Sequence, residues 1–425
     1  MAVHPDDGFP RTAAGFCRFP ACCCILWKIT VFDMPDPAQP VPVPLLPLLR
    51  SVKGRGTAEQ PQHRFNAFQR EAHHDGWSDD ADTDDSAPRL PTEVTFETAR
   101  SILTRNSSPD IPFSLSLNPY RGCEHGCIYC YARPTHAYLD LSPGLDFETR
   151  IVAKRNAGAL LRRELSRPGH SVSPIAIGTV TDAYQPVERR LRITREVLEI
   201  LVGCGHPFVI ITKSAGIERD LDLLVPAAAV GLCQVSISVT TLDPALARIL
   251  EPRAASPSRR LQAVRRLRDA GVPVDVNVAP IIPFINDAEI ERIVAAAADA
   301  GAQAAHYTIL RLPLEVAALF EHWLRANFPE RADRVLARVR ELHGIGQPSH
   351  PGSDGPAPVY SAAFGQRMRG TGPWADLIRQ RVARASRAAG MDQRLLDRLA
   401  VDRFVAPEAQ RSGRRPDDER QGELF

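Results

Sequence analysis

Residues 118–133 read Asn-Pro-Tyr-Arg-Gly-Cys-Glu-His-Gly-Cys-Ile-Tyr-Cys-Tyr-Ala-Arg, and this stretch decides the fold. It places Cys123, Cys127 and Cys130 at CxxxCxxC spacing on one short loop, with glycines that let the backbone fold closely around an inorganic core. A [4Fe–4S] cluster normally takes four thiolates. Three thiolates leave one iron open to a small molecule, so the spacing predicts a cluster that does chemistry as well as storing electrons.

A structural zinc site is the main alternative for the same cysteines. Zinc usually takes four ligands, often from two paired elements. His125 is too close in sequence to its neighbouring cysteines for an easy tetrahedron, and Cys204 and Cys233 have no paired partner. Zinc and a disulfide stay open as alternatives, and the cluster is favoured mostly by the family resemblance of the flanking residues.

The loop resembles that of the radical S-adenosylmethionine (SAM) superfamily, in which an aromatic residue, here Tyr129, precedes the third cysteine. The longer string 118–133 is similar to the branch related to spore photoproduct lyase, and the resemblance runs from about Phe113 to about Leu342. It implies that SAM chelates the open iron. It also implies that an external reductant of flavodoxin or ferredoxin type drives SAM cleavage to a 5′-deoxyadenosyl radical, which abstracts hydrogen from a substrate.

Length and composition allow one large domain with extensions. The chain has 425 residues, 44% of them hydrophobic, and a net charge of +2, which gives no strong field for a polyanion. Nine cysteines form no obvious disulfide ladder, and a cluster needs reduced thiols, so we expect a cytoplasmic protein. No apolar run reaches the ~18 residues of a membrane span.

Residues 1–95 are expected to be a disordered arm, because Pro, Asp, Ser and Gln dominate residues 35–95 and an acidic run covers 79–85. Residues 1–33 are also open to being a mis-called start, since Met34 follows them. Within the arm, Gly54-Arg-Gly56 and Arg64-Phe-Asn66 mix basic and small residues. They suit either a phosphate contact or packing onto the following domain, with a flexible arm as the simpler interpretation.

Residues 110–343 alternate short apolar runs with helical periods, which is typical of repeated βα units. Six such units with right-handed crossovers predict a curved parallel sheet with helices outside, the partial (βα)6 barrel that the resemblance implies. The expected strands are 113–117, 175–180, 208–212, 234–239, 272–278 and 304–310. The expected helices are 146–165, 188–202, 217–224, 244–250, 257–270, 287–300, 314–327 and 330–343.

Residues 344–425 are expected to form a linker and a helical extension. Pro, Gly and Ser dominate 348–358, whereas 374–389 and 392–404 have helical periods, and the chain from 407 onward is polar. We expect these helices to cap the barrel or to contact substrate.

Ligands of parallel sheets bind at the carboxyl ends of the strands, so the loops after the strands carry the candidate site. The resemblance implies that Tyr129 and Tyr131 pack near SAM, with shielding of the cluster from water as their simpler role. It implies that Asp182 holds the SAM amino group, although Asp is also a common helix cap. A lysine at a buried strand end needs a charged partner. For Lys213 the resemblance implies the SAM carboxylate, with Asp182 or Glu251 as the alternative.

Further candidates follow the later strands. Ser236 and Ser238 alternate to one face, and one of them is expected to reach the ribose or carboxylate of SAM. Arg311, after the sixth strand, is expected to point into the barrel mouth and hold substrate. Cys204 and Cys233 are expected in the core.

One position departs from the lyase pattern. The lyase has a cysteine about three residues before the aspartate that returns a hydrogen atom to the product, and Thr179 stands near that place here. No cysteine lies between Cys130 and Cys204, and a hydroxyl O–H is too strong to serve as the donor. Tyr184 is a speculative replacement, and lyase-like repair by that route is in doubt.

The resemblance makes a nucleic acid a candidate substrate, and a base inside a duplex must be extruded to be reached. Peptide and small-molecule substrates stay open. The competing class is a non-catalytic nucleic-acid-binding protein with zinc or a cluster as a staple. An electron-transfer protein is less favoured, because it would prefer four grouped cysteines. The supporting arginines, for which solvated helix surface is the simpler interpretation, are Arg189, Arg190, Arg192, Arg259, Arg260, Arg265, Arg266 and Arg268.

Overall fold

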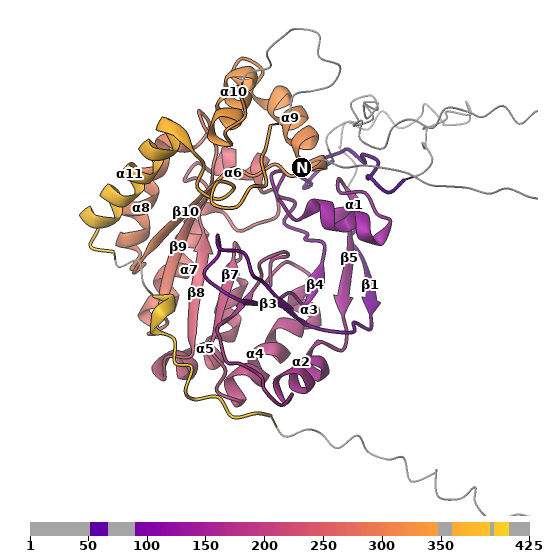
Figure 1. The fold of residues 1–425 in the computed structure, drawn as a ribbon, viewed down its shortest axis with the longest axis vertical. Helices are drawn as coiled ribbons and strands as arrows, with labels where there is room; N and C mark the ends of the chain where they lie inside the picture. Colours follow the sequence, from indigo (N-terminus) through magenta and orange to yellow (C-terminus); the bar gives the residue numbers. More distant parts are fainter. Residues whose placement is uncertain (1–51, 67–89, 347–358, 392–394, 408–425) are drawn as a thin grey trace, which may run out of the picture. The chain divides into compact units, whose positions relative to one another are not determined.

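The computed structural model describes residues 52–66, 90–346, 359–391 and 395–407. The chain divides into a unit of residues 1–42, which lies outside the described residues, and a unit of residues 43–425, which contains all of them. A seven-stranded sheet of order β10-β9-β8-β7-β6-β3-β2 forms the centre of this second unit (Figure 1).

Six strands of the sheet are parallel, and the seventh, β2 (Leu103–Arg105), runs antiparallel to β3 at one edge. The six confirm the expected βα units and the partial barrel. Apolar side chains of the strands, such as Val235 and Ile237, are fully buried in the main core with the outer helices. The parallel strands are β3 (Leu115–Leu117), β6 (Ile175–Ile177), β7 (Phe208–Thr212), β8 (Cys233–Ser238), β9 (Val274–Ile281) and β10 (Ala305–Ile309).

Helices connect the strands and pack along the outside of the sheet (Figure 1). Most of them lie within a few residues of the ranges that the 3.6-residue period predicts. They are α2 (Ala157–Leu165), α3 (Glu188–Leu191), α4 (Ile193–Gly203), α5 (Leu221–Ala229), α6 (Pro244–Leu250), α7 (Pro257–Asp269), α8 (Ile290–Asp299), α9 (Glu315–Asn327) and α10 (Ala332–Leu342), with short 3-10 helices η1 (Arg133–Leu139), η2 (Ala215–Asp220) and η3 (Asp287–Glu289).

The expected single helix over 146–165 is wrong. A short helix α1 (Asp146–Thr149) is followed by strand β5 (Arg150–Lys154), and only then by α2. Ile151 and Ala153 are fully buried and alternate with more exposed residues, which is the period of a strand. Strand β5 pairs with β1 (Glu93–Glu97) and β4 (Tyr120–Arg121) in a second, three-stranded sheet, so long-range pairing outweighs the local helical pattern.

The expected disordered arm over 1–95 is wrong for residues 52–66 and 90–95, because these segments pack onto the domain. Arg55, Thr57 and His63 are buried, and residues 93–95 belong to β1. Residues 1–33, which we considered as a possible mis-called start, and the acidic run 79–85 lie outside the described residues.

The C-terminal extension is helical only in part. Helix α11 (Gly372–Ala388) packs against α8, α10 and β10, close to the expected 374–389. The expected helix over 392–404 is wrong for its described part, where η4 (Leu396–Arg398) is followed by extended chain. That chain crosses the amino-terminal edge of the sheet, because Ala400 N–H donates to the carbonyl of Gly231 and Val405 N–H to that of Cys204. These inter-loop bonds replace the bonds within a helix.

The whole of the linker 348–358 lies in the gap between the described ranges. No helix in the described ranges is long and apolar enough to cross a membrane.

Candidate functional site

The three cysteines lie together on the loop that follows β3 and β4. Cys123 and Cys127 are buried and Cys130 is partly buried. Burial raises the pKa of all three thiols, that of Cys127 to about 12. The charges of Cys127 and Cys130 further raise the pKa of Cys123, and that of Cys130 raises the pKa of Cys127, so the three lie close together. The loop is fixed at its ends, because Cys123 N–H donates to Phe147 O (2.9 Å) and Ile128 N–H to Leu250 O (3.1 Å).

Arg133 holds the loop from within. Its guanidinium is fully buried and makes five hydrogen bonds, two of them to the carbonyls of Gly126 and Cys127 inside the loop. The Glu148 carboxylate, also fully buried, neutralises its charge at 2.5 Å. A buried guanidinium needs this complete set of acceptors to be stable, so Arg133 and Glu148 fix the loop's shape.

The N-terminal segment closes the outer side of the loop. Gly56 N–H donates to the Glu148 carboxylate (2.8 Å), and Arg55 donates to the Glu148 carbonyl (2.8 Å). A Cβ atom on Gly56 would lie 1.8 Å from the carbonyl oxygen of Gly126, so only glycine fits. Of the two roles left open for Gly54-Arg-Gly56, the structure shows packing onto the domain.

Gln185 and Glu124 join the loop to the segment after β6. Gln185, fully buried, accepts a hydrogen bond from Glu124 N–H (2.9 Å) and donates to Gly122 O (3.2 Å). The Glu124 carboxylate accepts from Val187 N–H (2.6 Å) and from the Thr92 hydroxyl (2.7 Å). The sequence analysis did not single out either residue. Only their positions mark them: Glu124 lies inside the cysteine motif, and Gln185 lies in the polar segment after β6.

Asp182 has its acceptor sites filled by protein donors. One oxygen accepts from Tyr184 N–H (2.9 Å) and the Thr212 hydroxyl (2.7 Å), and the other from Lys213 N–H (2.7 Å), with His125 Nδ1 at 3.3 Å. Burial alone would raise its pKa, but His125 and these donors outweigh it and lower the pKa below the usual range. A carboxylate offers about four acceptor sites. The arrangement favours the turn-capping role of Asp182 and leaves little capacity for a ligand amine.

Lys213 is the available cation at the site. Its ammonium lies 5.9 Å from the centre of the Tyr129 ring and lowers the pKa of Cys127 and Cys130 against the larger effect of burial. Within the described ranges no carboxylate pairs with it at 4.0 Å or less. The expected alternative partner Glu251 instead pairs with Arg260 and accepts a hydrogen bond from the Tyr129 hydroxyl.

Tyr131 and Arg311 cover the other side of the third cysteine. The Arg311 guanidinium carbon stacks 4.3 Å from the centre of the Tyr131 ring, and the Tyr131 hydroxyl donates to the carbonyl of Thr179. The Thr179 hydroxyl accepts from Asn118 (3.2 Å). Arg311 therefore lies beside the cysteine loop, and Thr179 belongs to the hydrogen-bonded frame around it.

A polar ladder crosses β8, β9 and β10. The Ser236 hydroxyl donates to Asp275 and accepts from Asn277 (2.6 Å), and His306 lies 3.8 Å from the Asp275 carboxylate. Burial raises the pKa of Asp275. Ser236 is thus engaged by protein groups, whereas the hydroxyl of the equally buried Ser238 has no hydrogen bond to the described residues.

Tyr184 lies in a structural network. Its hydroxyl donates to Asp220 (3.0 Å), which also pairs with Arg195 (2.9 Å) on α4 and Arg219 (2.9 Å) on η2. Burial raises the pKa of Tyr184 well above its usual value. This hydroxyl is occupied within the helical layer, which weakens the idea that it donates a hydrogen atom.

Several of the candidate arginines serve the fold. Arg260 is buried against Glu251, and Arg259 and Arg266 share Glu218 (2.5 and 2.6 Å). Arg265 donates to the Asp299 carbonyl, and Arg268 lies near Asp269. Cys204 and Cys233 are core residues, as expected.

Comparison with known proteins agrees with this geometry. A family model for the radical SAM superfamily matches residues 117–297, which include the cysteine loop and strands β6 to β9. The chain belongs to the radical SAM superfamily.

Relatives of this radical SAM protein occur in bacteria and archaea. An uncharacterised protein of Mycobacterium tuberculosis is 36% identical over 258 residues, covering 60% of this chain and 75% of that one. An uncharacterised protein of Methanocaldococcus jannaschii is 27% identical over 214 residues, 50% of this chain and 76% of that one. Among solved structures, spore photoproduct lyase complexed with dinucleoside spore photoproduct aligns with a TM-score of 0.49 and 14% identity over 70% of this chain and 80% of that one.

The donor set of this radical SAM protein fits an iron–sulfur cluster. Three thiols on one loop are the ligands such clusters take, and Cys123 and Cys127 are buried while Cys130 is partly buried. In the part of the chain that is described, no three or more His, Cys, Asp or Glu side chains are arranged around a single metal ion. A four-iron cube takes each thiolate at a different corner, so its ligands do not converge on one point.

Proposed function

We propose that the protein is a radical SAM enzyme in which Cys123, Cys127 and Cys130 hold a [4Fe–4S] cluster. When bound, such a cluster supplies an open iron that chelates SAM and an electron that cleaves it, so that hydrogen is abstracted from a substrate. The observation that carries the proposal is the grouping of three thiols, two buried and one partly buried, with the ammonium of Lys213, which forms no ion pair within 4.0 Å among the described residues.

The protein's part is to fix the donors and exclude water. Arg133 and Gln185 hold the loop through main-chain carbonyls and amides, so the thiols keep their positions while a ligand binds. The rings of Tyr129 and Tyr131 belong to the loop and are held in place by their hydroxyls. The Tyr129 hydroxyl donates to Glu251, and the Tyr131 hydroxyl donates to the carbonyl of Thr179. A dry, fixed site strengthens electrostatic interactions inside it and keeps reactive species from water.

Lys213 is the residue we propose for the carboxylate of SAM. An ammonium beside buried thiols requires a compensating anion, and a ligand carboxylate supplies one. Ser238, at the carboxyl end of β8, adds a hydroxyl that has no hydrogen bond to the described residues. We do not propose Asp182 as the ligand of the SAM amino group, because four protein groups already surround its carboxylate oxygens.

The substrate is proposed to be a polar molecule that meets the ladder of Ser236, Asp275, Asn277 and His306. His306 is 42% exposed, whereas Asp275 beneath it is buried, so the imidazole is the part of the ladder that a substrate reaches. A nucleic acid remains one such substrate. The electron is proposed to come from an external ferredoxin- or flavodoxin-type reductant.

The test uses full-length protein, purified without oxygen and reconstituted with iron and sulfide. We expect SAM to change the EPR signal of the reduced cluster, and dithionite to release 5′-deoxyadenosine. Cys127→Ala should lose iron, whereas the matched core variant Cys233→Ala should keep it. Lys213→Met should keep iron but weaken SAM binding about tenfold or more. A protein that binds zinc and ignores SAM would replace the enzyme with a metal-stapled binding protein.

A further inference from the structure

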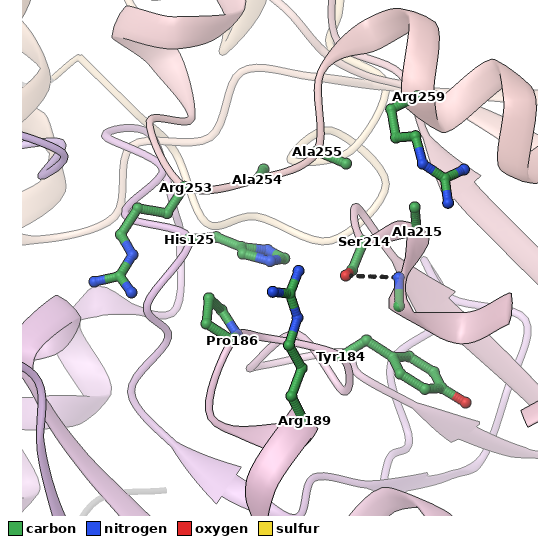
Figure 2. A pocket seen from close by; sticks show the side chains of 11 residues that line it. His125, Tyr184, Pro186, Arg189, Ser214, Ala215, Arg253, Ala254, Ala255 and Arg259 are labelled. Atoms are coloured by element: carbon green, nitrogen blue, oxygen red, sulfur yellow. Dashed lines mark hydrogen bonds between the residues drawn. The ribbon is translucent and has the colours of Figure 1, made fainter. Parts of the chain in front are cut away.

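A cationic pocket lies against the cysteine loop, apart from the cysteines themselves. It has a volume of about 310 Å³, and its lining includes His125, Arg189, Ser214, Arg253 and Arg259 (Figure 2). None of the three cysteines lines it, and neither does Lys213. Ligand pockets span roughly 300–1,000 Å³, so this one suits a small ligand or the end of a larger one.

Arg189 supplies an uncompensated charge to this pocket. It is an exposed residue of α3, and Figure 2 shows its guanidinium directed toward His125 and Ser214. Among the described residues its side chain makes no ion pair and no hydrogen bond. An extended arginine aimed at a cavity without an acceptor presents its donors to a ligand.

The other arginines outnumber the carboxylates that pair with them. Arg259, which lines the pocket, shares Glu218 with Arg266, so one carboxylate faces two guanidinium groups. Arg253 is balanced by Glu124 at 3.1 Å. Arg189, Arg253 and Arg259 line the pocket, and Arg266 lies next to it, so four guanidinium groups meet two paired carboxylates, Glu124 and Glu218. A third carboxylate, Asp182, lies 3.3 Å from His125.

We propose that this pocket binds a phosphate monoester. A monoester phosphate carries roughly −1.5 to −2 charges and three acceptor oxygens, which suits a pocket where guanidinium groups outnumber the carboxylates that pair with them. Arginine is suited to it because its planar donors engage two phosphate oxygens at once. A phosphodiester carries a single charge and a neutral ligand none, so both suit these guanidinium groups less well.

The position of the pocket links its occupant to the cysteine loop. His125 lies between Cys123 and Cys127 in the sequence, and its carbonyl accepts the N–H of Arg253 (3.3 Å). Ser214 directly follows Lys213. A phosphate held here therefore contacts both segments that carry the proposed cofactor ligands.

The test measures binding of thymidine 5′-monophosphate by calorimetry, with thymidine as the unphosphorylated control. Neither probe carries the adenine of SAM, and the titration is repeated with saturating SAM. A second arm compares one oligodeoxynucleotide with and without a 5′-phosphate, which distinguishes a free nucleotide from a nucleic-acid end. Both phosphorylated sources fit the proposal.

We expect Arg189→Gln to weaken phosphate binding about tenfold or more, while the neighbouring Arg190→Gln, which does not line the pocket, leaves it within about twofold. Three results would overturn the proposal: no binding of either phosphorylated probe, equal losses in the two variants, or displacement by SAM. The titration needs no SAM cleavage, so it stands or falls separately from the proposed reaction.

Discussion

Replacing Glu251 by Gln tests whether a buried charge pair holds the cysteine loop. The Glu251 side chain is fully buried, pairs with Arg260 and accepts a hydrogen bond from Tyr129 in the loop. Burial opposes its ionisation, but the charges of Arg260 and Lys213 prevail and lower its pKa from 4.5 to about 2. At roughly 1.4 kcal/mol for each tenfold change in proton affinity, this difference corresponds to about 3 kcal/mol of stability.

We therefore expect Glu251→Gln to lower the free energy of unfolding at pH 7 by about 3 kcal/mol, because Arg260 is left buried without a counter-charge. A carboxyl whose pKa is depressed stabilises the fold above its unfolded pKa, and this stability is lost as the pH falls from 4.5 toward 2. The difference between wild type and variant should shrink over that window. Urea unfolding followed by tryptophan fluorescence measures it, and Trp323, bonded to the Ile249 carbonyl, is a nearby reporter.

The matched control is Glu97→Gln. Glu97 pairs with Arg121 at 3.0 Å, but Arg121 is 44% exposed, and surface pairs contribute less than about 1 kcal/mol. The reasoning is refuted if Glu251→Gln costs no more than this control, or if its cost does not change between pH 5 and 2.

Three further outcomes follow from the packing. Gly56→Ala should cost more than about 2 kcal/mol in urea unfolding, because its Cβ would meet Gly126 O, whereas Gly203→Ala, with open space, should be neutral or stabilising. Burial lowers the pKa of His206 to about 4, so wild type should lose stability as the pH falls from 6.5 to 4, and His206→Gln should flatten that loss in acid titration. Amides of residues 126–133 should exchange as slowly in iron-free as in reconstituted protein by mass spectrometry; faster exchange without iron would show a metal-ordered loop.

The strands and most helices were predictable because their signals are local. Continuous apolar runs such as 208–212 and helical periods such as 257–270 are set within ten or fifteen residues. Strand β5 was missed because Ile151 and Ala153 gain their burial from β1 and β4, which are distant in sequence. The packing of residues 52–66 was missed for the same reason. Their composition is typical of a flexible arm, and their contacts with Glu148 and Gly126 are distant in sequence.

The cysteines of the site could be predicted, but the residues that hold them could not. Cys123, Cys127 and Cys130 are set by spacing, whereas Arg133 acts through Glu148 and through carbonyls that no pattern marks. For Asp182 the position could be predicted, but the role could not. A polar residue at a strand end is correctly placed by sequence at the site, yet its role depends on how many donors the fold brings to it, and that number is a property of the packed structure.

The loop's organisation has a consequence for metal binding. In small zinc modules metal binding and folding are one event, because few protein groups hold the ligands in place. Here the guanidinium of Arg133 makes five hydrogen bonds, two of them to carbonyls of the cysteine loop, and Gln185 makes two more with the loop. We therefore expect protein groups to order the loop, so that little of the free energy of metal binding goes into ordering it; the amide-exchange measurement tests this. His125 lines the same pocket as Arg189 and lies between Cys123 and Cys127 in the sequence, so a ligand beside Arg189 would meet the cysteine loop at this residue.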